Sequence, residues 1–277
     1  MTTTAASPVR PGAKRPSHAV ADAITLLCRN LLHMVRYPGL SLFTILGPVV
    51  ALLFIVYVFG GTLGAGLPGV DAGGGREAYV SYVLPGILMV TVASSAGGVA
   101  ITAAMDMTEG ITARFRTMAI SRSAVLAGHV LGNTIVGLIA VVLVFGVGLL
   151  IGFRPTADLP GWLSALGLIA LTCYAISWLG VAMGIQAKSV ETASNWPLLL
   201  TLLPFLGSGF VPTASMPEWL QWFAQYQPFT PLIEALRGLL FGTDLGWNLW
   251  VSLGWCVVII AIGYAWSMSI YERRSVR

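Results

Sequence analysis

The chain has 277 residues, of which 56% are hydrophobic and only 9% are charged, and its formal net charge is +4. The mean hydropathy is +0.83. Such a composition excludes an ordinary soluble domain and is typical of an integral membrane protein. We attribute the small positive charge to basic residues that set the orientation of the chain in the membrane and contact anionic lipids. It argues against nucleic acid as a partner.

Residues 1–17 are polar and carry three prolines and three basic residues, and no compact apolar region follows them as it would in a signal peptide. They predict a disordered cytoplasmic tail, so that residues 18–277 form one transmembrane domain. Within residues 19–36, apolar side chains recur at steps of four and three, while Arg29, His33 and Arg36 mark the opposite side. This pattern favours an amphipathic helix in the membrane interface; the alternative is a cytoplasmic extension of the first span.

Six apolar stretches follow, and none of them contains Asp, Glu, Lys or Arg. A helix of roughly 20 apolar residues crosses a bilayer core of about 30 Å, and in hydrocarbon the backbone must satisfy its own hydrogen bonds. We therefore expect an all-α integral membrane protein with six transmembrane helices, over residues 41–60, 79–104, 124–152, 160–186, 195–212 and 246–270.

The basic residues of the connecting segments predict the orientation. If the N-terminus is inside, twelve Lys and Arg residues lie inside, and only Arg76, Arg154 and Arg237 lie outside. This is a clear positive-inside bias. Both termini are therefore expected in the cytoplasm, and the chain is expected to cross the plasma membrane several times.

The stretch "EGITARFRTMAISR", residues 109 to 122, gathers charge between two apolar runs on the inner side. Ile111, Phe115 and Met118 recur at steps of four and three, so a short helix over about 109–121 would present one apolar face with a basic rim. Such a face suits docking to a partner protein. The alternative is a loop whose arginines only fix the topology, and composition leaves both open. The candidate docking residues are Glu109, Gly110, Arg114, Phe115, Arg116, Met118 and Arg122.

The outer segment 213–245 predicts two short amphipathic helices over about 217–241, each too short to cross the membrane. We expect them to lie at or dip into the outer leaflet as re-entrant helices before the last span; the alternative is a pair of surface helices. Pro217 suits the start of the first helix, and Trp219 and Trp222 suit the membrane interface. Thr230 is expected to cap the second helix, and Gly242 is expected to end it. Within that helix Glu234 and Arg237 are three residues apart on one face and are expected to pair.

The chain lacks the groups that would supply energy or covalent chemistry. It has no phosphate-binding loop ending in Gly-Lys-Ser/Thr, no metal-ligand cluster and no evident nucleophile with a base. His129 is the only titratable candidate in the spans, and a structural hydrogen bond is the expected role for it. Any energy for transport must therefore reach this chain from another chain on the cytoplasmic side. The glycine pairs in "GHVLG" and "GVAMG" are expected to pack within the chain.

The chain resembles, over nearly its whole length, the permease subunits of ABC-2 type exporters, especially the daunorubicin/doxorubicin-resistance type. Three motifs carry the resemblance in the right order: "YVLPGILMV" ending at residue 90, "EGITARFRTMAISRSAVLAG", and "FLGSGFVPTASMPEWLQWFAQYQPFTPLIEALRGLLFG". One departure is the stretch 207–210, where many relatives have a Ser followed by a small or polar residue.

The resemblance implies a six-span permease that pairs with a second copy or a paralogue and binds two copies of a cytosolic ATPase. The ATPase would hold ATP and magnesium, and this chain would hold no cofactor or metal. The segment 109–121 would be the coupling helix, the helix 19–36 would lie near the ATPase, and the external helices would close the outer end. Weak candidates for the substrate pathway are Asn195, Phe205 and Phe210, since aromatic and amide groups suit flat amphipathic molecules; packing is the alternative.

The expected function is export of an amphipathic, drug-like compound. Two alternatives remain at this point. The same fold could export or flip a lipid, glycolipid or polymer, since an uncharged aromatic pathway discriminates poorly between a drug and a lipid. The chain could also be a non-transporting membrane scaffold or immunity protein, with which no ATPase would co-purify.

Overall fold

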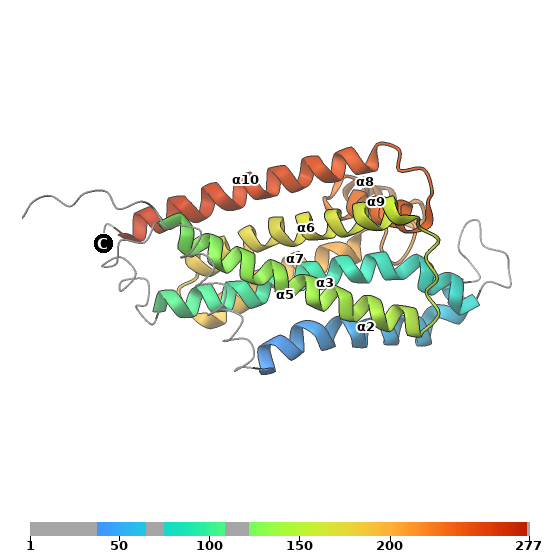
Figure 1. Cartoon of the computed structure of the whole chain (residues 1–277), viewed down its shortest axis with the longest axis horizontal. Coiled ribbons are helices and arrows are strands. Elements are labelled where there is room, and N and C mark those ends of the chain that lie inside the picture. Colours follow the sequence, from blue (N-terminus) through green and yellow to red (C-terminus); the bar gives the residue numbers. More distant parts are fainter. Residues whose placement is uncertain (1–37, 65–74, 109–121, 276–277) are drawn as a thin grey trace, which may run out of the picture.

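The computed structural model describes residues 38–64, 75–108 and 122–275, and every regular element in these ranges is a helix. Figure 1 shows the long helices side by side in one bundle. The elements are α2 (Pro38–Gly64), α3 (Gly75–Thr108), α5 (Arg122–Leu150), α6 (Leu159–Gln186), α7 (Val190–Leu202), the 3-10 helices η1 (Leu203–Leu206) and η2 (Thr213–Ser215), α8 (Glu218–Tyr226), α9 (Phe229–Phe241) and α10 (Asn248–Ser275).

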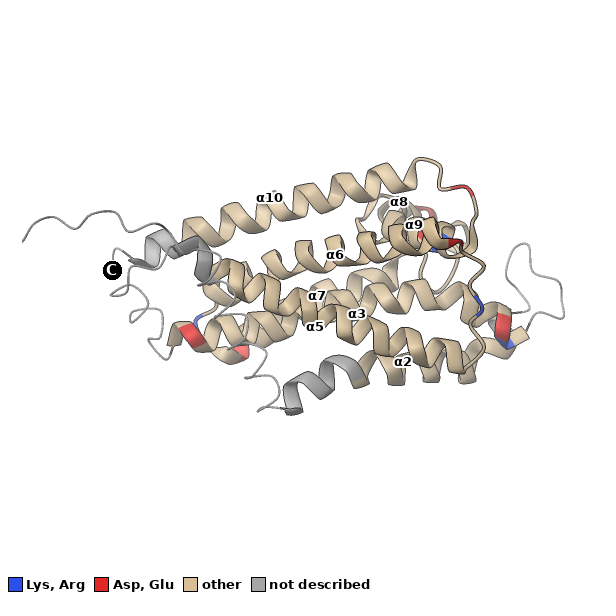
Figure 2. Ribbon diagram, viewed as in Figure 1, with Lys and Arg blue, Asp and Glu red and all other residues tan. Residues whose placement is uncertain are grey.

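Four helices in the described ranges are long and apolar enough to cross a membrane: Gly75–Thr108, Leu126–Leu150, Leu159–Gln186 and Asn248–Ile270. They confirm the helices expected for the second, third, fourth and sixth spans. The first expected span falls within α2, whose described apolar part, Leu46–Thr62, is shorter than these four. Charged residues gather at the two ends of the bundle in Figure 2, and the middle carries none. The beginning of α2 and the end of α10 lie at the same end (Figure 1).

The expected fifth span, 195–212, is wrong in its extent. The α-helix α7 begins earlier, at Val190, and ends at Leu202; η1 continues it for one tight turn to Leu206. A turn over residues 207–210 then ends the helix. Proline has no backbone N–H and glycine weakens helices, so Pro204 together with the two glycines of the turn stops the α-helix short of residue 212.

Helix α3 lies at the centre of the bundle and packs against α2, α5, α6 and α7. Small residues allow its closest contact, which is with α6. A Cβ placed on Gly180 would come within 2.8 Å of the Ala96 carbonyl oxygen, and one on Gly184 within 2.3 Å of the Ala100 carbonyl oxygen. The "GVAMG" pair therefore packs within the chain, as expected.

The segment 213–245 forms two short helices, α8 and α9, as the sequence predicts. Gly242 ends α9 in the left-handed conformation, with φ of 65°. The expected cap is wrong: α9 begins at Phe229, and the Thr230 hydroxyl donates to the Ala224 carbonyl instead of capping the helix. Prolines at 228 and 231 have no N–H, which leaves fewer free donors for a capping side chain in this first turn.

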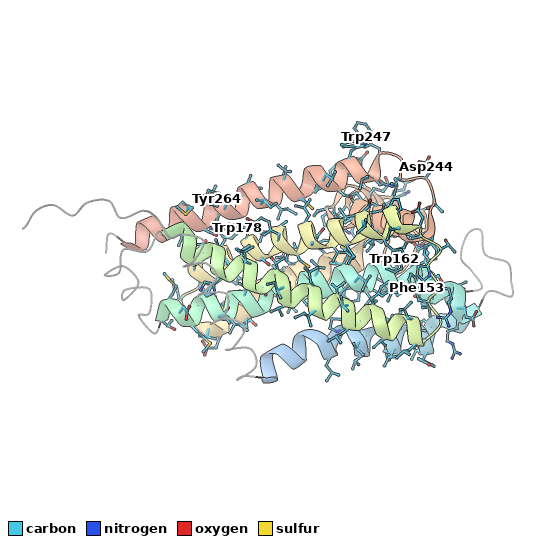
Figure 3. The ribbon with its side chains drawn as sticks, viewed as in Figure 1. Phe153, Trp162, Trp178, Asp244, Trp247 and Tyr264 are labelled. Atoms are coloured by element: carbon cyan, nitrogen blue, oxygen red, sulfur yellow. The ribbon has the colours of Figure 1, made fainter. Side chains whose placement is uncertain are left out.

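Helix α10 lies along one side of the bundle, packed on α6 and α9. Its contact with α6 includes Trp178 and Tyr264, whose rings meet edge to face with centroids 5.1 Å apart (Figure 3). A Cβ on Gly263 would come within 2.8 Å of the Trp178 Cβ, so the two backbones approach closely here. The remaining faces of α10 expose Val257, Val258 and Ile262, as expected for a helix in contact with lipid.

Candidate functional site

Several predicted site residues lie outside the described residues. These are the interface-helix residues Arg29, His33 and Arg36, together with Glu109, Gly110, Arg114, Phe115, Arg116 and Met118 of the expected coupling helix. The tail 1–17 lies outside them as well. Arg122 is the first residue of α5, and the structure describes its backbone only.

The two helices that lead into and out of the segment 109–121 are joined by a contact between a histidine and an aspartate. His129 Nε2 of α5 lies 3.2 Å from Asp106 Oδ2 of α3, and the side chains are only 8% and 16% exposed. The sequence predicts a structural hydrogen bond at His129 but does not identify its partner, Asp106.

Two of the three candidate pathway residues lie together. The rings of Phe205 and Phe210 stack with centroids 4.6 Å apart and planes within 3° of parallel, and Phe205 is 38% exposed. The Tyr79 hydroxyl lies 3.5 Å from the Phe210 carbonyl oxygen, which it faces as a weak donor. Asn195 is exposed in the first half of α7. It is separated from Phe205 by roughly 15 Å along the helix axis. The structure therefore brings the two phenylalanines together and leaves Asn195 apart from them.

Arg237 holds the turn 207–210 against α3 and α9. Its Nη1 donates to Glu234 Oε1 at 2.8 Å, which confirms the expected pair. Its Nη2 donates to two carbonyl oxygens, that of Tyr82 at 3.0 Å and that of Ser208 at 3.1 Å. The guanidinium carbon also lies 4.0 Å from the centroid of the Tyr82 ring, within cation–π distance. One side chain thus joins three segments that are far apart in the sequence.

Pro85 and Gly86 explain why the turn docks at this point of α3. Proline inside a helix removes one backbone hydrogen bond and distorts the preceding turn, so carbonyls near Tyr82 become accessible to an outside donor. A Cβ on Gly86 would come within 2.6 Å of Gly209 Cα, so only glycine lets the two backbones touch. The "LPG" of the second-span motif therefore has a packing reason.

The surroundings of this turn contain buried polar atoms without hydrogen-bond partners among the described residues. They are the Ser208 hydroxyl, both amide atoms of Gln227, and Arg237 Nε. A Cβ on Gly207 would come within 2.8 Å of Gln227 Nε2, which places this amide directly against the turn. Unpaired buried polar atoms are costly, so substitution of these side chains by apolar ones tests whether they have partners.

Helix α8 presents aromatic side chains outward at the same end of the bundle. Pro217 precedes its first residue, and Trp219 and Trp222 are both exposed. Trp247, just before α10, projects away from the bundle in Figure 3. Tryptophan with one apolar and one polar edge is enriched at membrane–water interfaces, so these residues are consistent with the expected membrane boundary.

The short turn between α6 and α7 lies at the opposite end (Figure 1). The Ser189 hydroxyl accepts the Thr192 N–H at 3.3 Å and so caps α7. Hydrogen bonds to the exposed carboxylate, first from the Ser189 side chain and then from the backbone, lower the pKa of Glu191. This turn therefore carries a stable negative charge beside the exposed Lys188.

The described residues contain no group of three His, Cys, Asp or Glu that could hold a metal ion. Cys173 and Cys256 are free and buried. Their chemistry fits packing, since both belong to the buried apolar cluster and the Thr172 hydroxyl lies 3.7 Å from Cys256 Sγ.

A family model described as ABC-2 type transporter matches residues 22–241. The daunorubicin resistance ABC transporter permease protein DrrB1 of Streptomyces coeruleorubidus is 27% identical over 95% of this chain and 90% of the relative. The probable doxorubicin resistance ABC transporter permease protein DrrC of Mycobacterium tuberculosis is 26% identical over 66% of this chain and 68% of the relative. ABC transporter G family member 20 of Dictyostelium discoideum is 22% identical over 69% of this chain and 27% of the relative.

The family match covers well over half of the chain and includes α2 to α9. It agrees with the apolar helices, which together with these relatives make the chain a multi-pass plasma membrane protein. The chain belongs to the ABC-2 type transporter family.

Proposed function

We propose that this chain is the permease subunit of an ATP-driven exporter that moves an amphipathic, drug-like compound outward across the plasma membrane. The observation that carries this proposal is the likeness to a daunorubicin resistance permease over 95% of the chain. A second relative, named for doxorubicin resistance, supports the same class of compound. Both names describe planar aromatic compounds with polar substituents.

The proposal includes six spans with both termini in the cytoplasm, as the basic residues predict. Helix α2 and the chain from α7 to η1 would supply the first and fifth spans beside the four long helices. A second permease copy or a paralogue would complete the pathway, and two cytosolic ATPase subunits would bind ATP and magnesium. The beginning of α2 and the end of α10 lie at the same end of the bundle, which supports an even number of crossings.

In this proposal the coupling helix 109–121 sits in a cleft of the ATPase and moves when ATP binding brings the two ATPases together. Arg114, Phe115 and Arg116 would make the main contact, because an apolar side chain rimmed by positive charge suits a partner groove. Rigid helices can carry a discrete two-state change from such a contact into the membrane. The interface helix 19–36 would lie nearby.

The stacked pair of Phe205 and Phe210 would offer a flat aromatic surface to the compound. Offset and parallel ring contacts favour planar ligands by about 0.5–1.5 kcal/mol each. Phe205 is 38% exposed, which leaves part of this surface accessible to a ligand. The external helices α8 and α9 would close the outer end, and Arg237 would hold the turn that carries Phe210.

The first test is purification of the wild-type chain from its native membranes together with any bound ATPase, followed by reconstitution and ATP turnover. Doxorubicin, which is fluorescent, serves as the transport probe. The variant Arg114→Ala/Arg116→Ala is expected to lose ATPase binding or transport. Its matched control is Arg273→Ala/Arg274→Ala, which removes the same charge from the inner side at the other end of the chain.

Three results would count against the proposal. Wild type that retains no ATPase would favour a non-transporting scaffold. A complex that moves a fluorescent phosphatidylethanolamine analogue and leaves doxorubicin behind would favour a lipid as cargo. Equal loss of binding in both double variants would mean that the arginines act only on topology.

A further inference from the structure

The Asp106–His129 pair is a polar contact in an otherwise apolar part of the bundle. Asp106 belongs to the last turn of α3, and His129 lies two turns into α5. The two nitrogen and oxygen atoms are 3.2 Å apart, and both side chains are largely buried. The second ring nitrogen, Nδ1, is buried without a hydrogen-bond partner among the described residues. Asp106 Oδ2 is therefore the contact that fixes the imidazole ring.

The surroundings of the pair strengthen it. A separate buried cluster joins α3, α5 and α6 at this end of the bundle, and it contains Ala103, Leu126, Val130 and Trp178. Ala103 stands one turn before Asp106, and Leu126 and Val130 flank His129 on its own helix. The two side chains are only 8% and 16% exposed, so their attraction is stronger than at an exposed surface. Separation of the two helices would break this contact.

The pair joins the two helices that flank the segment 109–121. Asp106 stands three residues before the segment 109–121, and His129 stands eight residues after that segment. The contact therefore closes a loop whose two arms are α3 and α5. Any push on the segment from the cytoplasmic side reaches both helices through their ends. While the pair is intact, one arm cannot slide along the other.

We propose that Asp106 and His129 are positioning residues that make α3 and α5 move as one body, so that movement of the segment 109–121 is passed into the bundle. This inference rests on the proposed function, in which that segment contacts the ATPase. Helix α3 is also the helix to which Arg237 binds the turn 207–210, by the hydrogen bond to the Tyr82 carbonyl. Helix α3 thus runs from the Asp106–His129 pair to the turn 207–210.

The bundle does not need this pair for its general packing. The glycine contacts of Gly180 and Gly184 already hold α3 against α6. Asn133 of α5 donates hydrogen bonds to Ser177 of α6 at 2.8 Å and to Ser95 of α3 at 3.4 Å, nearer the middle of the bundle. Loss of the Asp106–His129 contact is therefore expected to loosen the ends of α3 and α5 next to the segment 109–121. The packing in the middle of the bundle is expected to remain intact.

The test uses the reconstituted complex of this chain with its ATPase and measures doxorubicin moved per ATP hydrolysed. Asp106→Ala and His129→Ala each remove the contact, and Asp106→His/His129→Asp exchanges its two members. The control is Thr172→Val, which removes another buried polar contact, between α6 and α10, away from the loop. The thermal unfolding midpoint of each variant shows whether it is folded.

The single variants are expected to hydrolyse ATP at rates within about two-fold of wild type and to move about five-fold less doxorubicin per ATP, or less still. The exchanged pair is expected to restore much of the ratio, which a merely structural role would not require. Folded single variants with the wild-type ratio would overturn the inference, as would an equal loss in Thr172→Val. Wild type without a bound ATPase would overturn the proposed function, and the inference with it, which is a distinguishable result.

Discussion

Arg237 is the side chain whose loss should most weaken the outer end of the bundle. It is 17% exposed and donates to Glu234, to the Tyr82 carbonyl and to the Ser208 carbonyl. We predict that Arg237→Met destabilises the protein far more than Glu234→Gln. Methionine fills a similar volume without charge, so the effect isolates the lost hydrogen bonds and the lost contact with the Tyr82 ring.

The magnitude follows from these contacts. Each hydrogen bond from the guanidinium to a buried carbonyl contributes about 1.5–3 kcal/mol, and the cation–π contact adds about 0.5–2 kcal/mol. The ion pair with Glu234 adds little, about 1 kcal/mol or less, because that carboxylate is one-third exposed. Methionine regains part of the loss through packing. The expected net cost is about 3–5 kcal/mol for Arg237→Met and below about 1 kcal/mol for Glu234→Gln.

The assay is thermal unfolding in detergent, followed with a thiol-reactive fluorophore. Cys173 and Cys256 are buried, so they react only when the bundle opens. A variant without Cys28 serves as the background, which removes the remaining thiol. The expected cost of Arg237→Met corresponds to a fall in midpoint of roughly 10 °C for a chain of this size.

Arg237→Lys separates charge from geometry. Lysine keeps the positive charge, but one ammonium group cannot reproduce the planar contact with the ring and both carbonyls. Its midpoint is expected between those of wild type and Arg237→Met. The reasoning would be refuted by an Arg237→Met midpoint within about 2 °C of wild type, a shift that corresponds to less than about 1 kcal/mol. It would also be refuted if Glu234→Gln were as harmful as Arg237→Met.

Three further predictions use the same unfolding assay. Gly184→Ala is expected to cost about 1–3 kcal/mol, because its Cβ would meet the α3 backbone. The control is Gly167→Ala on the same helix, which meets open space and should be neutral or stabilising. Equal effects of the two substitutions would contradict the close contact. Gln227→Met is expected to stabilise by about 1 kcal/mol, since it removes an amide that is 5% exposed and unpaired; a loss of stability would mean that the amide is satisfied. Asn133→Leu is expected to cost about 0.6–2 kcal/mol, and a similar cost for Ser177→Ala would confirm that one hydrogen bond joins them.

Local sequence signals predicted those parts of the fold that local physics determines. The long apolar runs gave α3, α5, α6 and α10 to within a few residues, because backbone hydrogen bonding in lipid leaves a helix as the only solution. Gly242 ended α9 as predicted, since its left-handed conformation is a local property. The pairing of Glu234 with Arg237 was predictable from helix spacing alone.

The errors have physical reasons as well. The fifth span was drawn as one helix to residue 212 because hydropathy does not register Pro204 or the glycines of the turn, which end the helix earlier. Thr230 has the right chemistry for a cap, but tertiary contact with Ala224 determines where its hydroxyl points. Asp106 was missed because its partner His129 lies on another helix, and no spacing along one chain segment reveals such a contact.

The distance along the chain between Tyr82 and Arg237 has a consequence for synthesis. These residues are 155 positions apart, yet they share a hydrogen bond that helps to seat the turn 207–210. At about 5–20 residues per second, the ribosome delivers Arg237 roughly 8–30 s after Tyr82. During that interval α3 enters the bilayer while the Tyr82 carbonyl still lacks its hydrogen bond from Arg237. A newly made chain therefore passes through a state in which α3 is already inserted but Arg237 does not yet hold the turn 207–210. Removal of the C-terminal third of the chain would leave the protein in that state.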